Sequence, residues 1–488
     1  MLTECSTELF EFARVEGHKV VASFDGGTMT SDAGALLLGQ TDQALRLIDR
    51  FAACFNDQRR PELTEHSVST LIGQRIHGIA LGYEDLNDHD QLRHDPLFAV
   101  LAGKLQSRRP QCAPVAGKST LNRLELSKPE PTRYHKISYD AAAIEALFVD
   151  LFLEAHQCAP DQIVLDLDAT DDPIHGAQEG RFFHGFYDRY CYLPLYIFCG
   201  RHLLVAKLRR ANIDASAGAI AEVERIVRQI RARWPQVRIL LRADSGFARD
   251  ALMAWCEANT VDYLFGLAKN DRLIKEIASE LAAAAEDSAQ SGKPARRFKD
   301  FSYQTLSSWS RQRRVIGKAE WMTPSLAETD DTTLSTKAKS AKAAAIDPAQ
   351  PAGRANPRFV VTSLPAKTHE ARDLYERLYC ARGEMENRIK ECQLDLFSDR
   401  TSAHTMRANQ LRLWLASMAY VLTSALRRIG LAKTRFADAT CGTIRMKILK
   451  IGAFIRVSVR RIKFSMASAF PYTDDFAAAW AALDNAAR

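Results

Sequence analysis

Two aspartates interrupt an apolar stretch of the chain that is rich in β-branched residues. Asp166 and Asp168 stand two residues apart in the run that begins at Ile163. Side chains two apart on a strand share one face of a sheet, so both carboxylates are expected to point the same way. Burying unpaired carboxylates is costly, and oxygen ligands suit a hard divalent cation. The pattern indicates a metal site; a strand that runs into a solvated loop, with Asp171 and Asp172 capping the next element, is the alternative.

A further carboxylate, Asp244, ends a second apolar run and is followed by a serine and by Gly246. Ligand sites in α/β sheets favour the carboxyl ends of strands. Asp244 is therefore expected at such an edge, where it would meet the first pair of aspartates. An aspartate that only caps the following helix is the alternative interpretation.

A fourth carboxylate, Glu386, lies in a long segment of helical periodicity, residues 369–394. Apolar residues such as Met385 and Ile389 mark the buried side of this helix, and Glu384 falls on the far side. One narrow sector beside the apolar stripe carries Tyr379, Arg382, Glu386 and Lys390. This position lets Glu386 point into a site, although an exposed ion pair with the lysine four residues on is the alternative.

The elements around these carboxylates follow an order typical of an α/β protein. A helix leads into three strands, and a helix, a strand, a second helix and a strand come next. This order predicts a mixed sheet covered by helices. The expected helices are 139–157, 216–234 and 247–259, and the expected strands are 163–168, 189–198, 202–209, 237–244 and 262–268.

The regions outside this stretch differ in composition. The N-terminal part reads as mainly helical, which suits a DNA-binding module. After residue 270 the pattern changes to helix followed by strands, and residues 327–357 carry few large apolar side chains, as is typical of a flexible excursion. The predicted regions are a helical DNA-binding region (1–135), the first part of the core (136–270), a largely β insertion (271–357), the second part of the core with the Glu386 helix (358–430) and a basic C-terminal region (431–488).

Composition limits the class of protein and its compartment. The 488 residues are 47% hydrophobic and 26% charged, with a formal net charge of +7, which favours a polyanionic partner. Between residues 401 and 467 lysine and arginine recur, and Asp438 is the only acidic residue. The ten cysteines form no C-x-x-C pair, the N-terminus has no signal-peptide pattern, and the apolar run 413–426 is too short to span a bilayer. A cytoplasmic protein with no membrane partner is expected.

Taken in order, the acidic motifs resemble those of the DDE transposases of bacterial insertion sequences. An aspartate follows one strand, Asp244-Ser-Gly follows a second, and Tyr379-x-x-Arg382-x-x-x-Glu386 lies on a helix. The wording Leu-Asp-Leu-Asp-Ala-Thr-Asp-Asp-Pro-Ile-His-Gly from residue 165, with Asn-Arg-Ile-Lys-Glu directly after Glu386, is similar to the thirteen-eighty group. The resemblance covers nearly the whole chain, including Asp25-Gly-Gly near its start.

The resemblance carries expectations about fold, chemistry and partners. It implies a ribonuclease H-like core, interrupted by the insertion before the Glu386 helix. It implies two Mg²⁺ ions, with Mn²⁺ as an alternative, held by Asp168, Asp244 and Glu386. The expected activity is nicking at the terminal inverted repeats of an insertion sequence, followed by joining of the 3′-hydroxyl ends to target DNA. A homodimer in the synaptic complex and a nucleoid-associated place in the bacterial cytoplasm are the further expectations.

Several basic residues are expected to contact double-stranded DNA. Tyr379 and Arg382 would meet phosphate, because the arginine fork suits phosphate oxygens. The C-terminal basic tract would neutralise the DNA backbone through Arg456, Arg460, Arg461 and Lys463. The related pattern places a lysine seven residues after the glutamate, where this chain has Gln393. Lys390 shares the face of Glu386 and is the candidate substitute.

The choice between the first two aspartates depends on their place along the strand. Asp168 lies nearer the strand end and two residues before Thr170, so it is assigned the metal role, with Asp166 as a neighbouring support. The same Asp-x-Asp-x-Thr pattern fits a haloacid dehalogenase-type phosphohydrolase, in which Asp166 would be phosphorylated and Asp168 would act as acid and base. A non-catalytic DNA-binding protein derived from a transposase is the third possibility.

Overall fold

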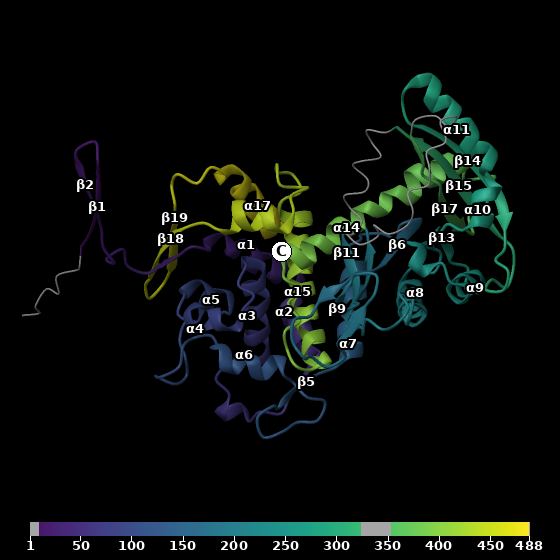
Figure 1. Cartoon of the computed structure of the whole chain (residues 1–488). Helices are drawn as coiled ribbons and strands as arrows, with labels where there is room; N and C mark the ends of the chain where they lie inside the picture. The colour runs from purple at the N-terminus through teal and green to yellow at the C-terminus, as the bar shows by residue number, and fades with distance from the viewer. Residues whose placement is uncertain (1–8, 324–352, 488) are drawn as a thin grey trace, which may run out of the picture. The chain divides into compact units, whose positions relative to one another are not determined.

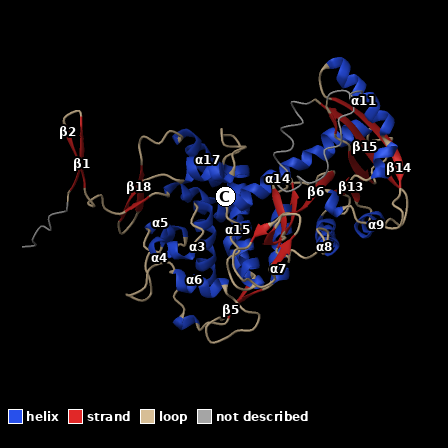
Figure 2. Ribbon diagram, viewed as in Figure 1, coloured by secondary structure: helices blue, strands red, loops and turns tan. Residues whose placement is uncertain are grey.

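The computed structural model describes residues 9–323 and 353–487, and most of the predicted flexible segment, residues 327–352, lies outside this part. The chain divides into two compact units, each assembled from separated stretches of sequence (Figure 1). Unit 1 comprises Met1–Leu147, Ile174–Glu179 and Lys390–Arg488; unit 2 comprises Phe148–Pro173 and Gly180–Ile389. Helices dominate unit 1, whereas the large sheet belongs to unit 2 (Figure 2).

The sheet of unit 2 is mixed and has nine strands, in the order β11-β10-β6-β12-β13-β17-β15-β14, with β16 (Arg354–Ala355) paired to β15. Strands β6, β12 and β13 run parallel, and every other neighbouring pair is antiparallel. The strands are β6 (Gln162–Ala169), β10 (Leu195–Cys199), β11 (His202–Lys207), β12 (Arg238–Ala243), β13 (Asp262–Leu267), β14 (Ala295–Tyr303), β15 (Arg313–Met322) and β17 (Arg358–Thr362).

The two faces of this sheet bury different elements. Helices α7 (Ala141–Glu154), α8 (Ala219–Arg233) and α9 (Asp250–Ala258) pack on the face that carries the odd-numbered residues of β6 and β12. The even-numbered residues of the same strands face a smaller cluster, which includes Leu374 and Tyr375 of the Glu386 segment. Because strand side chains alternate, Asp166 and Asp168 share this second face, as the sequence predicts.

The Glu386 segment is helical throughout but is not one regular α-helix. It runs through α13 (Ala371–Asp373), a π-helical turn (Leu374–Tyr379), a 3₁₀ turn (Cys380–Arg382) and α14 (Gly383–Lys390), and a second π-helical turn follows (Glu391–Asp395). A π turn holds more residues than an α turn, so side chains leave the ideal 100° spacing. The predicted sector is therefore only approximate.

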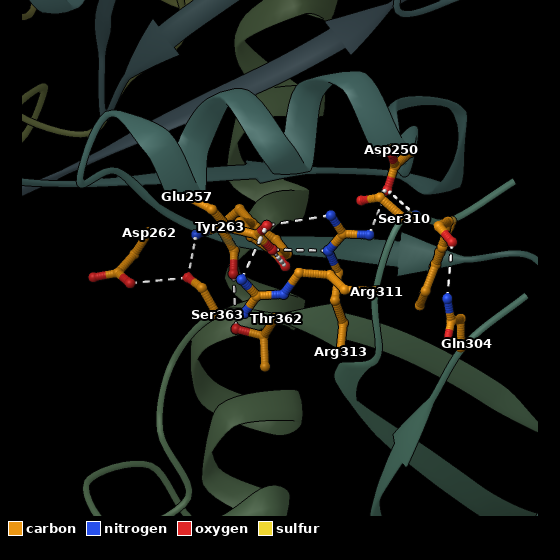
Figure 3. Close-up of polar contacts among 11 residues, drawn as sticks. Asp250, Glu257, Asp262, Tyr263, Gln304, Ser310, Arg311, Arg313, Thr362 and Ser363 are labelled. Atoms are coloured by element: carbon orange, nitrogen blue, oxygen red, sulfur yellow. Dashed lines mark hydrogen bonds and ion pairs between the residues drawn. The ribbon is translucent and has the colours of Figure 1, made fainter.

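The segment predicted as an insertion contains α10 (Asp271–Glu276) and α11 (Ala278–Ser291) ahead of its strands, and β15 pairs with β17 within the main sheet. Buried Arg313 at the start of β15 fixes this attachment. Its guanidinium donates from Nη1 to Asp250 Oδ1 at 2.6 Å and from Nε to Glu257 Oε1 at 2.8 Å (Figure 3). Tyr263 Oη donates to the same Glu257 oxygen at 2.8 Å. These bonds join β15 to α9 and β13.

A small antiparallel sheet of order β7-β9-β8 follows β6 in the chain. Its strands are β7 (Asp172–Pro173), β8 (Phe182–His184) and β9 (Arg189–Tyr192). The single strand expected over residues 189–198 is wrong, because β9 ends at Tyr192 and β10 begins at Leu195. Pro194 lies in the gap, where its missing N–H cannot support a sheet ladder.

Unit 1 packs N-terminal helices against C-terminal ones. Helix α3 (Val68–Leu81) is capped by Ser67, is followed by Gly82 as its C-cap, and contacts α15 (Met406–Ala425). Between α6 (Lys118–Glu125) and these helices, Glu125 is fully buried. It accepts from Arg75 Nε and Arg412 Nε, each at 2.8 Å. The buried triad ties segments almost 300 residues apart into one core.

Short hairpins and further helices complete unit 1. The hairpins are β1 (Phe10–Val15) with β2 (His18–Ala22), and β18 (Ala453–Val457) with β19 (Ile462–Met466). Helix α17 (Thr473–Ala487) packs on α1 (Leu36–Leu45). Within the part of the chain that the structure describes, no helix combines the length and hydropathy needed to cross a membrane.

Candidate active site

Two parallel strands bring Asp168 and Asp244 to one edge of the sheet. In the β6–β12 register Asp166 lies opposite Arg242, and Leu167 lies opposite Ala243. Asp168 and Asp244 are the next residues along the two strands, so both stand at the carboxyl end of the pair. This is the edge at which ligands bind in α/β sheets. The structure thus places these two predicted residues together.

Asp166, two residues earlier on β6, is held by an arginine. It is 4% exposed, and Arg242 donates to both of its oxygens, with Nη2 to Oδ2 at 2.8 Å. Arg242 also donates to the carbonyl oxygen of Leu378 in the Glu386 segment. Burial raises the pKa of Asp166, while the hydrogen bonds from Arg242 lower it. The Asp166 carboxylate is therefore satisfied by the protein itself.

Asp168 has no comparable partner. Its Oδ1 accepts from the Ala169 N–H at 2.9 Å, and its Oδ2 lies 3.7 Å from Arg382 Nη1. Burial raises the pKa of Asp168 to about 6; Arg382 opposes the rise, and the negative charges of Asp244 and Glu386 add to it. The other two carboxylates of the predicted triad therefore both act on Asp168 through space.

Arg382 lies among these carboxylates. Its Nη2 donates to Glu386 Oε1 at 2.7 Å, and the side chain of Glu386 is 45% exposed. Burial lowers the pKa of Arg382. The charge of Asp168 raises this pKa, and so do Tyr379, Glu386 and Asp244 in decreasing order. Their combined effect is larger than that of burial, so the net shift is upward. Its Nη1 is buried and has no hydrogen-bond partner among the described residues. The Glu386 carboxylate thus pairs with Arg382, and the alternative of an exposed pair with the lysine is not what the structure shows.

Asp244 and Tyr379 meet above Gly266. Asp244 Oδ1 accepts from the Gly246 N–H at 2.9 Å, so this aspartate does cap the short turn that follows β12, while it also faces the site. Burial raises the pKa of Tyr379, and the charge of Asp244 raises it too, against the effect of Arg382. A Cβ atom on Gly266 would lie 2.5 Å from Tyr379 Oη and 2.9 Å from the backbone nitrogen of Ser245. The absence of a side chain at Gly266 of β13 therefore leaves room for the Tyr379 hydroxyl.

The remaining predicted DNA-binding residues lie in unit 1. Lys390 is the last residue of α14 and is exposed, and Gln393 lies in the π-helical turn that follows. The basic tract forms the tip of the β18–β19 hairpin, where all four of its side chains are exposed: Arg456, Arg460, Arg461 and Lys463.

Within residues 9–323 and 353–487, no three His, Cys, Asp or Glu side chains are arranged as ligands of a metal ion. The chemistry of the site nonetheless fits a hard divalent cation. Three carboxylates supply oxygen donors, and their mutual repulsion calls for positive charge. In the part of the chain that the structure describes, Arg382 supplies positive charge to Asp168, and its buried Nη1 is left without a hydrogen bond.

The comparison with known families agrees with this geometry. The model of the family described as transposase DDE domain group 1 matches residues 12–346 and 345–488. The chain belongs to this family of DDE transposases. No curated protein matches the sequence. Two residues in the site of this DDE transposase are not predicted from the sequence. The pairing of Arg242 with Asp166 depends on the register between two strands, and Gly266 carries no signal that a single sequence reveals.

Proposed function

We propose that this transposase nicks DNA at the terminal repeats of an insertion sequence and joins the 3′-hydroxyl ends to target DNA. The observation that carries the proposal is the gathering of Asp168, Asp244 and Glu386 around Arg382 at the carboxyl end of β6 and β12. Local structure does not require three carboxylates from distant parts of the chain to gather near one arginine, since capping the turn after β12 involves Asp244 alone. The proposal includes the finer assignment to the thirteen-eighty group.

Asp168, Asp244 and Glu386 are the residues that would hold two Mg²⁺ or Mn²⁺ ions. Such ions activate the attacking oxygen and stabilise the leaving oxygen of a phosphodiester. The protein's own contribution is to fix these carboxylates and to keep Asp166 out of the ligand set through its pair with Arg242. Arg382 would turn its fork to a phosphate oxygen once its carboxylate neighbours have another cation, with Tyr379 beside it.

The sheet supports the proposal of a ribonuclease H-like core. Three antiparallel strands, β11, β10 and β6, are continued by the parallel strands β12 and β13. The first and fourth strands in chain order carry the two aspartates at adjacent ends. The Glu386 segment covers the same face of this sheet.

Double-stranded DNA is the partner that the charge of unit 1 favours. The β18–β19 hairpin presents a basic tip, and a two-stranded ribbon fits the major groove. A cavity of about 550 Å³ elsewhere in unit 1 has several basic side chains in its lining. These include Arg59, Arg60, Arg109, Arg123, Arg133 and Lys136. We further propose that two copies act together on paired DNA ends, in the bacterial nucleoid.

The two alternative functions are less well supported. In a phosphohydrolase of the haloacid dehalogenase type, Asp166 would have to attack a phosphate, but both of its oxygens are engaged by Arg242. A non-catalytic DNA-binding descendant would not need to keep three other carboxylates within the electrostatic influence of one arginine.

The experiment is a nicking assay with supercoiled DNA that carries the repeats flanking the gene, in Mg²⁺ and in a chelator. The wild type should nick only in Mg²⁺, and Asp244→Asn should not nick at all. Glu384→Gln is the control for the removal of a carboxylate. Glu384 lies in the same turn of α14 as Glu386 but is exposed. Nicking by Asp244→Asn at the wild-type rate would refute the proposal.

A further inference from the structure

The β8–β9 hairpin, which follows the Asp168 strand in the chain, exposes aromatic side chains. Phe183 is 52% exposed and Phe186 is 73% exposed, and Phe182 and Tyr190 are exposed as well. In the register Phe183 lies opposite Tyr190, and their ring centroids are 5.6 Å apart. Exposed apolar groups gathered in one place mark binding sites more often than isolated ones do.

The foot of this hairpin is fixed to the strand that carries Asp168. Tyr187 Oη donates to the carbonyl oxygen of Ala169, the residue directly after Asp168, at 3.2 Å. Cys191 and Leu193 are buried, and Tyr187 and Ala169 pack against the cluster that they form. Burial raises the pKa of Tyr187, and the charges of Asp171, Asp168 and Asp244 raise it further. The hairpin therefore stands within electrostatic reach of two of the three carboxylates.

The exposed rings are accompanied by positive charge. The guanidinium carbon of Arg181 lies 3.8 Å from the centroid of the Tyr190 ring, and Arg189 is exposed with its Nη1 3.7 Å from Asp171 Oδ2. Unpaired nucleotides are bound by groups of these two kinds. Arginine attracts the phosphate backbone, and aromatic rings stack on the bases. A phosphate at the carboxylates would bring its neighbouring nucleotides towards this hairpin.

We propose that the hairpin of residues 181–190 stacks DNA bases that have left the duplex next to the phosphodiester that is cut. Bases inside a duplex are covered by their neighbours, so Phe183 and Phe186 can stack only on an unpaired base or between separated ones. This inference rests on the proposed nicking activity and adds the form of DNA on which the site acts, namely a locally unpaired end.

The test compares two double variants. Phe183→Leu with Phe186→Leu keeps apolar bulk but removes the rings, whereas Phe183→Tyr with Phe186→Tyr keeps stacking. The first should nick an intact duplex about tenfold more slowly or worse, because stacking contributes about 1–3 kcal/mol per base. It should nick a duplex with mismatches at the cut site nearly as fast as the wild type does. The tyrosine variant should behave as the wild type on both, as should Leu306→Ala, a control at an exposed apolar residue of the same unit.

A second measurement does not depend on cleavage. Affinity for a short labelled thymidine strand should fall in the leucine variant and persist in the tyrosine variant, while affinity for a duplex of equal length stays constant. Suppose that the wild type nicks none of the substrates while its binding to single strands still depends on the two rings. That result would count against the proposed function but not against this inference. Equal slowing on intact and mismatched DNA, unchanged strand binding, or an altered oligomeric state in the leucine variant would each overturn the inference.

Discussion

Arg242 lies directly opposite Asp166 across the β6–β12 pair and donates hydrogen bonds to both of its carboxylate oxygens. Both side chains are almost fully buried. The pair separates two aspartates that stand two residues apart on one strand. One is neutralised by two hydrogen bonds from a buried arginine, and the other, Asp168, has only a long ion pair with Arg382 at the edge of the sheet.

Breaking this pair should destabilise unit 2. Asp166→Ala leaves a buried guanidinium without its partner, which costs about 3–5 kcal/mol in comparable cases. The double variant Asp166→Leu with Arg242→Met removes both charges and should recover much of the loss. Urea unfolding of the three proteins measures this, and equal instability of the single and double variants would contradict the account.

The same relationship predicts a difference between the two aspartates in catalysis. Asp168→Asn keeps the shape but removes a proposed metal ligand, so Mg²⁺-dependent nicking should collapse while binding to the terminal repeats persists. Asp166→Asn should leave measurable nicking, because Asp166 is held away from the ligand set. Rates of nicking and electrophoretic binding assays settle the order, and a dead Asp166→Asn beside an active Asp168→Asn would reverse the assignment.

Asp168 also predicts how stability depends on pH. Burial raises its pKa in the folded protein to about 6, above its ordinary value of 3.8, so the folded state favours the protonated acid. Protonation of Asp168 stabilises the folded state fully below about pH 4, and this stabilisation is lost as pH rises through 6. Relative to Asp168→Asn, the free energy of unfolding of the metal-free wild type should fall by roughly 3 kcal/mol between pH 4 and 7. Urea titrations of both proteins in a chelator test this, and a constant or rising difference would contradict it.

Gly266 predicts a steric effect on Tyr379. Gly266→Ala places a methyl group against the tyrosine hydroxyl and the backbone of Ser245, and should destabilise the protein by about 1–3 kcal/mol and slow nicking. Tyr379→Phe in the same chain should restore part of the stability, since it removes the clashing oxygen. Gly383→Ala is the control, because its Cβ would meet nothing within 4 Å. Full additivity of the two changes would show that the contact does not matter.

The basic tip of the β18–β19 hairpin predicts the salt dependence of DNA binding. Replacing Arg456, Arg460, Arg461 and Lys463 by glutamine should reduce the slope of log K against log salt by about 3–4, since each phosphate contact contributes roughly 0.9. Anisotropy titrations over a range of KCl concentrations measure the slope. Arg228→Gln, at an exposed position of α8, should leave the slope unchanged. An unaltered slope in the quadruple variant would remove the tip from the interface.

The sequence predicted most elements of unit 2 and the shared face of Asp166 and Asp168, because alternation along a strand is a local property. The partner of Asp166 could not be predicted, since register between strands depends on contacts 76 residues apart in the chain. The sector of Tyr379 and Glu386 assumed a regular helix, and the π-helical turn changes that spacing. Gly266 matters only through what lies above it, which no single sequence records.

The attachment of β15 to β17 has a consequence for how the chain can change in length. Leu267 ends β13 and lies opposite Phe359 of β17. The segment between them, which adds β14 and β15 to the edge of the sheet, therefore begins and ends at neighbouring, hydrogen-bonded positions. A segment whose ends already meet imposes little closure entropy on the rest, whatever its length. A two-residue turn could join β13 to β17 as a plain hairpin, at the cost of the edge that β15 now covers. This site is therefore a natural point for gaining, exchanging or losing whole modules without disturbing the strands that carry Asp168 and Asp244.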